Sequence, residues 1–146
     1  MGRIRDRGND GGNTYRWFTI EKFVKENNWT RGVELGVHDG VNFKHLIKSC
    51  PELHLIGVDL YEAQPDNNGP EKWTPGENGH PWKHNQYHQN MLKFCEGYSD
   101  RAGIIKDYTT SAAEHFAEES LDFVFISRLQ FFLYYNCTLF KIYQKI

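Results

Sequence analysis

The apolar positions of the chain follow two alternating patterns, one typical of amphipathic helices and one typical of buried strands. Ile20, Phe23 and Val24 recur at helical spacing with charged residues around them, so they mark one face of a helix. Residues 54–59 are apolar at nearly every position, as expected of a strand covered on both faces. In chain order the pattern predicts a helix at 17–28, a strand at 32–36, a helix through 43–47, a strand at 54–59, a helix at 82–98, a strand at 102–106, a helix at 110–119 and a strand at 121–126.

Strands that alternate with helices predict a parallel sheet, because each parallel connection needs a crossover that a helix can supply. We therefore expect an α/β fold: a Rossmann-like, three-layer α/β/α domain with a mostly parallel sheet over residues 14–128. Residues 1–13 mix charged residues with glycine and have no apolar period, which predicts a flexible tail. Residues 61–81 hold four of the five prolines, which predicts a long inserted loop.

Composition narrows the classes of function. The 146 residues, 39% of them hydrophobic, suffice for one core of ordinary size. Lys and Arg number 17 against 19 for Asp and Glu, a net charge of −2, so nucleic acid is an unlikely partner. The three cysteines form no CxxC pair, which argues against a disulfide framework. Without a signal peptide or a membrane-length apolar run, we expect a cytoplasmic protein with no membrane partner; the oligomeric state cannot be read from the sequence.

Glycine and acidic residues follow the first two predicted strands. The first strand runs into Glu34, Gly36 and Gly40, in the pattern E-x-G-x-x-x-G. Glycines at such a place allow a tight turn and a close approach of backbone N–H groups to a ligand. The second strand ends in Asp59, whose carboxylate can accept hydrogen bonds from ribose hydroxyls. Together these residues predict a ligand that contains a nucleoside.

Two classes of nucleoside cofactor compete for this pattern. A dinucleotide fingerprint starting at Gly36 would need glycine at the positions of His38 and Val41, so NAD is the weaker hypothesis. The acidic residue, the two glycines four apart and the acidic end of the next strand instead resemble class I S-adenosylmethionine (SAM)-dependent methyltransferases. The resemblance covers about residues 17–126. The segments similar to the methyltransferase-24 branch of that family are 32–46, 55–61 and 121–126.

The resemblance implies a SAM site at the ends of three strands. In such enzymes the methionine part lies over the first glycine turn, the ribose lies at the acidic end of the second strand, and the adenine packs against the loop after the third. Matched by position, the implied residues are Glu34, Gly36, His38, Gly40 and Asn42 for methionine, Asp59 and Leu60 for ribose, and Asp107 and Tyr108 for adenine. The implied reaction is methyl transfer, in which the protein mainly aligns donor and acceptor. We expect a small molecule or a sugar as acceptor, with a peptide left open.

Histidines and aromatic residues gather at and after the inserted loop. His80, His84 and His88 lie four residues apart, a spacing that can bind a metal. Because a proline separates the first two, we expect solvated or substrate-contacting groups and no metal site. The aromatic residues of this region are Trp73, Trp82 and Tyr87. They either cover the substrate or give the insertion a small core of its own.

The family pattern fails after the fourth strand. Related enzymes carry an Asp-x-x-His-like segment there, whereas this chain has Ser127 and Gln130. The catalytic residue is therefore unknown, with His38, His84 and His88 the only candidates for a base.

The composition also changes sharply at this point, since no Gly, Pro, Ala, Asp or Glu follows Arg128. We interpret residues 129–146 as an atypical aromatic tail on a truncated or frame-shifted methyltransferase whose sheet is incomplete at its C-terminal end. Two rival hypotheses stay open. One is an NAD- or nucleotide-binding oxidoreductase or sugar-modifying enzyme, and the other is a remnant that binds SAM without turnover.

Overall fold

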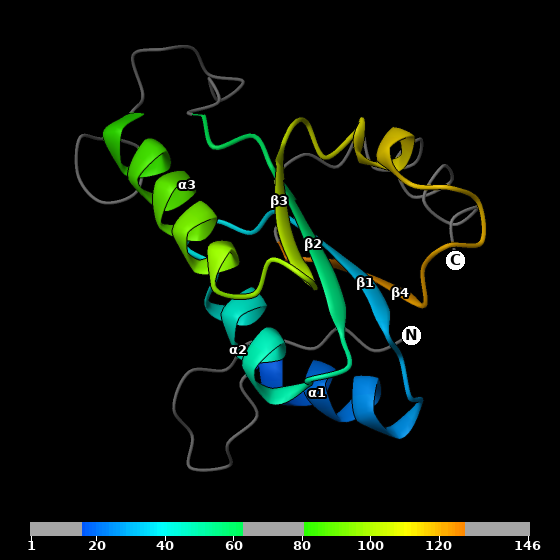
Figure 1. Ribbon diagram of the computed structural model, residues 1–146. Helices are drawn as coiled ribbons and strands as arrows, with labels where there is room; N and C mark the ends of the chain where they lie inside the picture. Colours follow the sequence, from blue (N-terminus) through cyan, green and yellow to red (C-terminus); the bar gives the residue numbers. More distant parts are fainter. Residues whose placement is uncertain (1–15, 63–80, 128–146) are drawn as a thin grey trace.

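The computed structural model describes residues 16–62 and 81–127, and the side chains of all of these except 81–83 (Figure 1). In chain order its elements are α1 (Arg16–Glu26), β1 (Arg31–Leu35), α2 (Val41–Ser49), β2 (His54–Asp59), α3 (Pro81–Glu96), β3 (Ala102–Lys106), the 3-10 helix η2 (Ala112–His115) and β4 (Phe123–Ile126). All strand pairs are parallel and the sheet order is β3-β2-β1-β4. This order matches the first four strands of a doubly wound sheet. The predicted Rossmann-like α/β fold is confirmed.

One predicted helix is wrong. In place of a helix at 110–119, the chain forms only the single turn η2, after which Phe116 is extended and Glu119 has a positive φ of 52°. A short helix depends on packing of its apolar face for stability, and here only Ala112 and Ala113 are fully buried against the sheet. Residues 63–80 of the loop expected at 61–81 lie outside the described residues, and so do the tails expected at 1–13 and 129–146.

The two faces of the sheet are covered differently. α1, α2 and α3 pack on one face, where Phe43, Leu46 and Leu55 are completely buried. On the other face, Val33 and Val58 contact η2, which Figure 1 shows in yellow-orange on the opposite side of the sheet from the three helices. The fold thus has the three layers that the alternating pattern predicted.

The register of the strands brings their carboxyl ends to one edge of the sheet. Leu35 of β1 pairs with both Val58 and Ile126, and Asp59 of β2 pairs with Lys106. The residues that follow each strand therefore lie side by side beyond the carboxyl ends of the strands, where open α/β sheets bind ligands.

Candidate functional site

The turn between β1 and α2 is built on left-handed backbone. Gly36, His38 and Gly40 have φ values of 82°, 56° and 76°. Gly40 needs to be glycine for a second reason, because a Cβ at this position would lie 2.1 Å from the Sδ atom of Met91. The turn is closed by a hydrogen bond of 2.9 Å from the Gly40 N–H to the Val37 carbonyl. The E-x-G-x-x-x-G pattern thus forms the tight turn that the sequence predicted.

Asp59 joins this turn to the end of β2. Its Oδ2 accepts a hydrogen bond of 2.8 Å from the N–H of His38, and its Oδ1 accepts one of 2.8 Å from the N–H of Tyr61. Each carboxylate oxygen retains lone-pair capacity for another donor. The predicted residues of the glycine turn and of β2 therefore lie together, with Leu60 half-buried between Asp59 and Tyr61.

Glu34 is a buried acid beneath the turn. Its exposed fraction is 1%, and its Oε2 accepts a hydrogen bond of 3.1 Å from Nδ2 of Asn42, which is itself 2% exposed. Burial raises the pKa of Glu34 to about 8, and the negative charge of Asp59 adds to the rise. The hydrogen bonds from Asn42 and Ser127 and the positive charge of Arg16 oppose it. The Glu34 carboxyl is therefore mainly neutral at pH 7 in the folded protein.

Unsatisfied polar atoms gather around these acids. Within the described chain, the buried side-chain atoms without a hydrogen-bond partner are Arg16 Nε, His38 Nε2, Asn42 Oδ1 and Tyr61 OH. Arg16 and Asn42 interact with Glu34, His38 belongs to the glycine turn, and Tyr61 follows β2 two residues after Asp59. Such atoms are rare in native interiors because burying them without a partner is costly. Their concentration here marks a place where a polar ligand would supply the missing partners.

Helix α3 packs directly against the turn and the segment after β2. The ring of Tyr87 lies 4.7 Å from that of His38, and His88 stacks on Tyr61 at 4.8 Å. Burial lowers the pKa of the His88 imidazole, and the charge of Lys106 lowers it further. His88 is thus brought to the site. The sequence alone gave no signal for Tyr61, since only the tertiary fold brings its ring under α3.

No group of three potential metal ligands occurs among residues 16–62 and 81–127. His84 lies on α3 together with His88, whereas His80 lies outside the described residues. Among the helices that the structure describes, none has the length and apolar character needed to cross a membrane.

The residues after β3 stand beside Asp59. The N–H of Asp107 donates to the Asp59 carbonyl at 3.2 Å. Asp107 Oδ2 lies 2.7 Å from Nε2 of His115, and its Oδ1 accepts a hydrogen bond of 2.7 Å from the N–H of Tyr108. These two contacts, that of His115 first, hold the pKa of Asp107 below its usual range. The Tyr108 side chain is 53% exposed. His115 is a neighbour of the predicted site that the sequence analysis missed.

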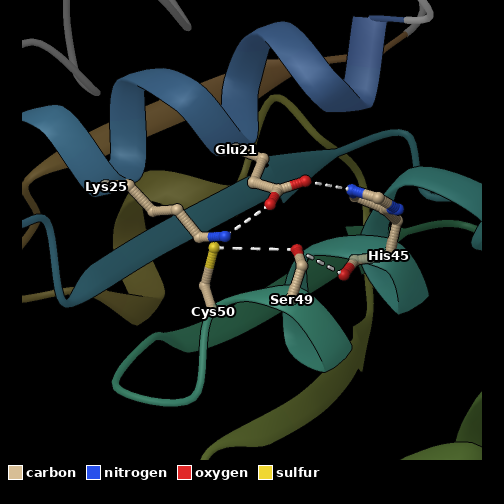
Figure 2. Close-up of polar contacts among 5 residues, drawn as sticks. All are labelled: Glu21, Lys25, His45, Ser49 and Cys50. Atoms are coloured by element: carbon tan, nitrogen blue, oxygen red, sulfur yellow. Dashed lines mark hydrogen bonds and ion pairs between the residues drawn. The ribbon is translucent and has the colours of Figure 1, made fainter.

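A polar network fixes α1 against α2. Figure 2 shows Glu21 of α1 between Lys25 and His45, with distances of 2.5 Å to Lys25 Nζ and 2.6 Å to His45 Nε2. The hydrogen bond from Lys25 is the main cause of the lowered pKa of Glu21, so this carboxylate is ionised at neutral pH. Ser49 donates to the His45 carbonyl at 2.8 Å and contacts the sulfur of Cys50. The network holds the N-terminal helix in place relative to the helix that carries Asn42.

Comparison with known proteins gives similarity in structure alone. No protein-family model and no curated protein sequence matches the chain. Among solved structures, it is similar to a protein described as a caffeoyl-CoA O-methyltransferase from Staphylococcus aureus, with a TM-score of 0.55, 14% identity and coverage of 86% of this chain and 51% of that one.

Two further solved structures are similar to most of this chain. The S-adenosylhomocysteine (SAH)-bound methyltransferase PaMTH1 of Podospora anserina has a TM-score of 0.60 and 11% identity, with coverage of 92% of this chain and 48% of that one. Spermidine synthase of Thermotoga maritima has a TM-score of 0.52 and 13% identity, with coverage of 82% and 35%. This chain thus spans about half or less of the chains it matches, and the likeness establishes the fold.

Proposed function

We propose that the protein is a SAM-dependent methyltransferase, within the class I fold and of the methyltransferase-24 type. The observation that carries the proposal is the pairing of a left-handed glycine turn after β1 with a carboxylate at the end of β2. The similarity to several methyltransferases, one of them bound to SAH, supports the same conclusion. We further propose that the protein acts in the cytoplasm on a small molecule or sugar.

The residues at the strand ends suit the three parts of this cofactor. Glu34, Asn42 and the backbone of the glycine turn would hold the methionine part. Asp59, which already orders two backbone N–H groups, would accept from the ribose hydroxyls, with Leu60 beside it. The exposed ring of Tyr108 would pack on the adenine, and Asp107 would accept from its amino group.

SAM itself supplies the reactive methyl group. The task left to the chain is to position the donor and to exclude water. Methyl transfer requires no obligatory acid or base from the protein, so Ser127 in place of the acid of related enzymes does not by itself exclude turnover. Among the described histidines near the site, the ring of His38 contacts Tyr87, the ring of His88 stacks on Tyr61, and His115 Nε2 lies 2.7 Å from Asp107 Oδ2. A remnant that binds SAM without turnover would show binding with no methyl transfer to any acceptor.

Calorimetry with SAH tests the proposal. SAH binds the wild type and raises its melting temperature, whereas NAD does neither. Asp59→Ala weakens SAH binding by about 2–4 kcal/mol, because charge-assisted hydrogen bonds to the ligand are lost; this corresponds to roughly 30- to 700-fold. Asp100→Ala, which removes an exposed carboxylate from the turn after α3, leaves the affinity unchanged.

The ligand-free melting temperature of each variant separates loss of binding from loss of fold, because Asp59 also accepts from two backbone N–H groups. Asp59→Asn, which keeps the size of the side chain, serves as the second variant. Binding of NAD in preference to SAH would favour a dinucleotide-dependent enzyme. Unchanged SAH affinity in both Asp59 variants would remove Asp59 from the site.

A further inference from the structure

The carboxylate of Asp59 is held by two residues with unusual backbone. The N–H groups that donate to its Oδ2 and Oδ1 belong to His38 and Tyr61, at 2.8 Å each. Both residues have left-handed backbone, with φ values of 56° and 49°. This conformation is uncommon for any residue with a Cβ and is rare for one with a side chain as bulky as that of tyrosine. Such strain persists only where the surrounding structure enforces it.

Helix α3 contacts both strained residues through two consecutive side chains. The ring of Tyr87 lies 4.7 Å from that of His38, with an angle of 49° between the planes. The ring of His88 stacks on that of Tyr61 at 4.8 Å, with an angle of 22°. One helix therefore supports both N–H groups that bind Asp59.

The polar atoms of the two strained residues do not explain where their rings lie. His38 Nε2 and Tyr61 OH are buried and have no hydrogen-bond partner among the described residues. His38 Nδ1 lies 3.5 Å from Asp39 Oδ1, which is longer than an ordinary hydrogen bond. Burial and the charge of Lys106 lower the pKa of His88, so its imidazole is mainly neutral at pH 7 when it stacks. Contact between aromatic rings is thus what holds the two residues against α3.

We propose that Tyr87 and His88 are positioning residues for the Asp59 carboxylate. Their rings hold His38 and Tyr61 in left-handed backbone, and the N–H groups of these two residues orient the carboxylate oxygens. The inference rests on the proposed function and deepens it. A carboxylate that is fixed in advance binds the vicinal hydroxyls of a ribose without reordering, so more of the interaction is available as affinity. Helix α3 thereby sets how tightly the site binds a ligand that contains ribose.

Calorimetry of SAH binding to variants of the full chain tests this role. Tyr87→Ala and His88→Ala each weaken SAH binding about two- to tenfold, the value of one aromatic pair. Tyr87→Phe and His88→Phe retain a ring and keep the wild-type affinity. The matched control is Gln86→Ala, which changes an exposed side chain of α3 that donates to Asn90 at 3.0 Å, and it leaves the affinity unchanged. The melting temperature without SAH shows whether each variant is folded.

Two substitutions of His38 separate positioning from direct contact with the ligand. Both His38→Ala and His38→Gly remove the imidazole and its contact with Tyr87. Alanine keeps the Cβ that makes a φ of 56° unfavourable, whereas glycine adopts this conformation readily. We therefore expect His38→Ala to weaken SAH binding about two- to tenfold, as for the loss of the Tyr87 ring, and His38→Gly to keep the wild-type affinity.

The possible results separate the inference from the function on which it rests. Unchanged SAH affinity in folded Tyr87→Ala and His88→Ala would overturn the positioning role and leave the proposed function standing. Equal weakening by His38→Ala and His38→Gly would show that the imidazole itself binds the ligand, and it would also overturn the role. If Tyr87→Ala does not fold, the comparison of the two His38 variants decides. Failure of the wild type to bind SAH would overturn the proposed function and the inference with it.

Discussion

Burial of the Glu34 carboxyl makes the stability of the fold depend on pH. The ordinary carboxyl of the unfolded chain ionises near pH 4.5 and the folded one near 8. Between these values the unfolded state releases a proton that the folded state retains, so the free energy of unfolding falls by about 1.4 kcal/mol per pH unit. The stabilisation is present at low pH and is lost as the pH rises through the folded pKa. Arg16 and Asp59 are the charged groups that face this carboxyl.

Glu34→Gln removes this dependence. The glutamine has the shape of the protonated acid, and its side-chain oxygen can accept from Nδ2 of Asn42. The free energy of unfolding of the variant, relative to wild type, therefore rises between pH 5 and 8 and levels off above 8. Urea denaturation of both proteins at each pH unit from 5 to 9 measures the difference. A difference that stays constant over this range would mean that the Glu34 carboxyl is ionised in the folded protein.

Single residues of the site differ in how far the sequence reveals them. Glu34, Gly40 and Asp59 belong to short local patterns at strand ends, so their positions could be predicted from spacing alone. Arg16 and Tyr61 could not be predicted, because only tertiary contacts bring the first turn of α1 and the ring of Tyr61 to these acids. What marks both residues is a buried polar atom without a hydrogen-bond partner, and this can be recognised only in the folded structure.

At the scale of elements, helix α3 restricts which residue can stand in the glycine turn, because Met91 of α3 packs directly against Gly40. Gly40→Ala places a methyl group in left-handed backbone and against Met91 Sδ, and we expect a loss of about 2–4 kcal/mol in the free energy of unfolding. In a Met91→Ala background the steric part disappears, so the same substitution costs about 1–2 kcal/mol less. A double-mutant cycle by urea denaturation gives this coupling.

The control for this cycle is Gly103→Ala on β3. A Cβ there would lie 3.1 Å from the flexible end of Ile56, so we expect a smaller loss than at Gly40. If Gly40→Ala lowers the free energy of unfolding equally in the wild-type and Met91→Ala backgrounds, backbone strain alone explains the loss, and steric contact with α3 does not contribute.

Sequence periodicity predicted elements well where both faces of an element pack. The bounds of β2 and β3 match the predicted 54–59 and 102–106, because the two strands pair with each other along their length and each has apolar side chains in the clusters on both faces of the sheet. In place of the helix expected at 110–119 the chain forms only the single turn η2, because the apolar residues that this segment buries, Ala112 and Ala113, belong to one turn. Periodicity indicates which face can be buried, while the length of the element depends on what the fold supplies to cover it.

At the scale of the whole molecule, one core links the helices that frame the site. Cys50, at the end of α2, and Cys95, on α3, belong to the same buried cluster and are 3% and 7% exposed. Burial also raises the pKa of the Cys95 thiol to about 11, which suppresses the reactive thiolate at neutral pH. Both thiols should therefore react with an alkylating reagent only when the core opens.

Because the two thiols share one core, we expect iodoacetamide to modify them at similar rates, both far below the rates in urea. If the opening is global unfolding, SAH at 100 times its Kd slows both reactions about a hundredfold, since only the folded state binds it. Peptide mapping over time reads Cys50 and Cys95 separately. Protection of Cys95 alone would show that Cys50 is exposed by a local opening of α2 that the ligand does not control, and the core would then not act as one cooperative unit.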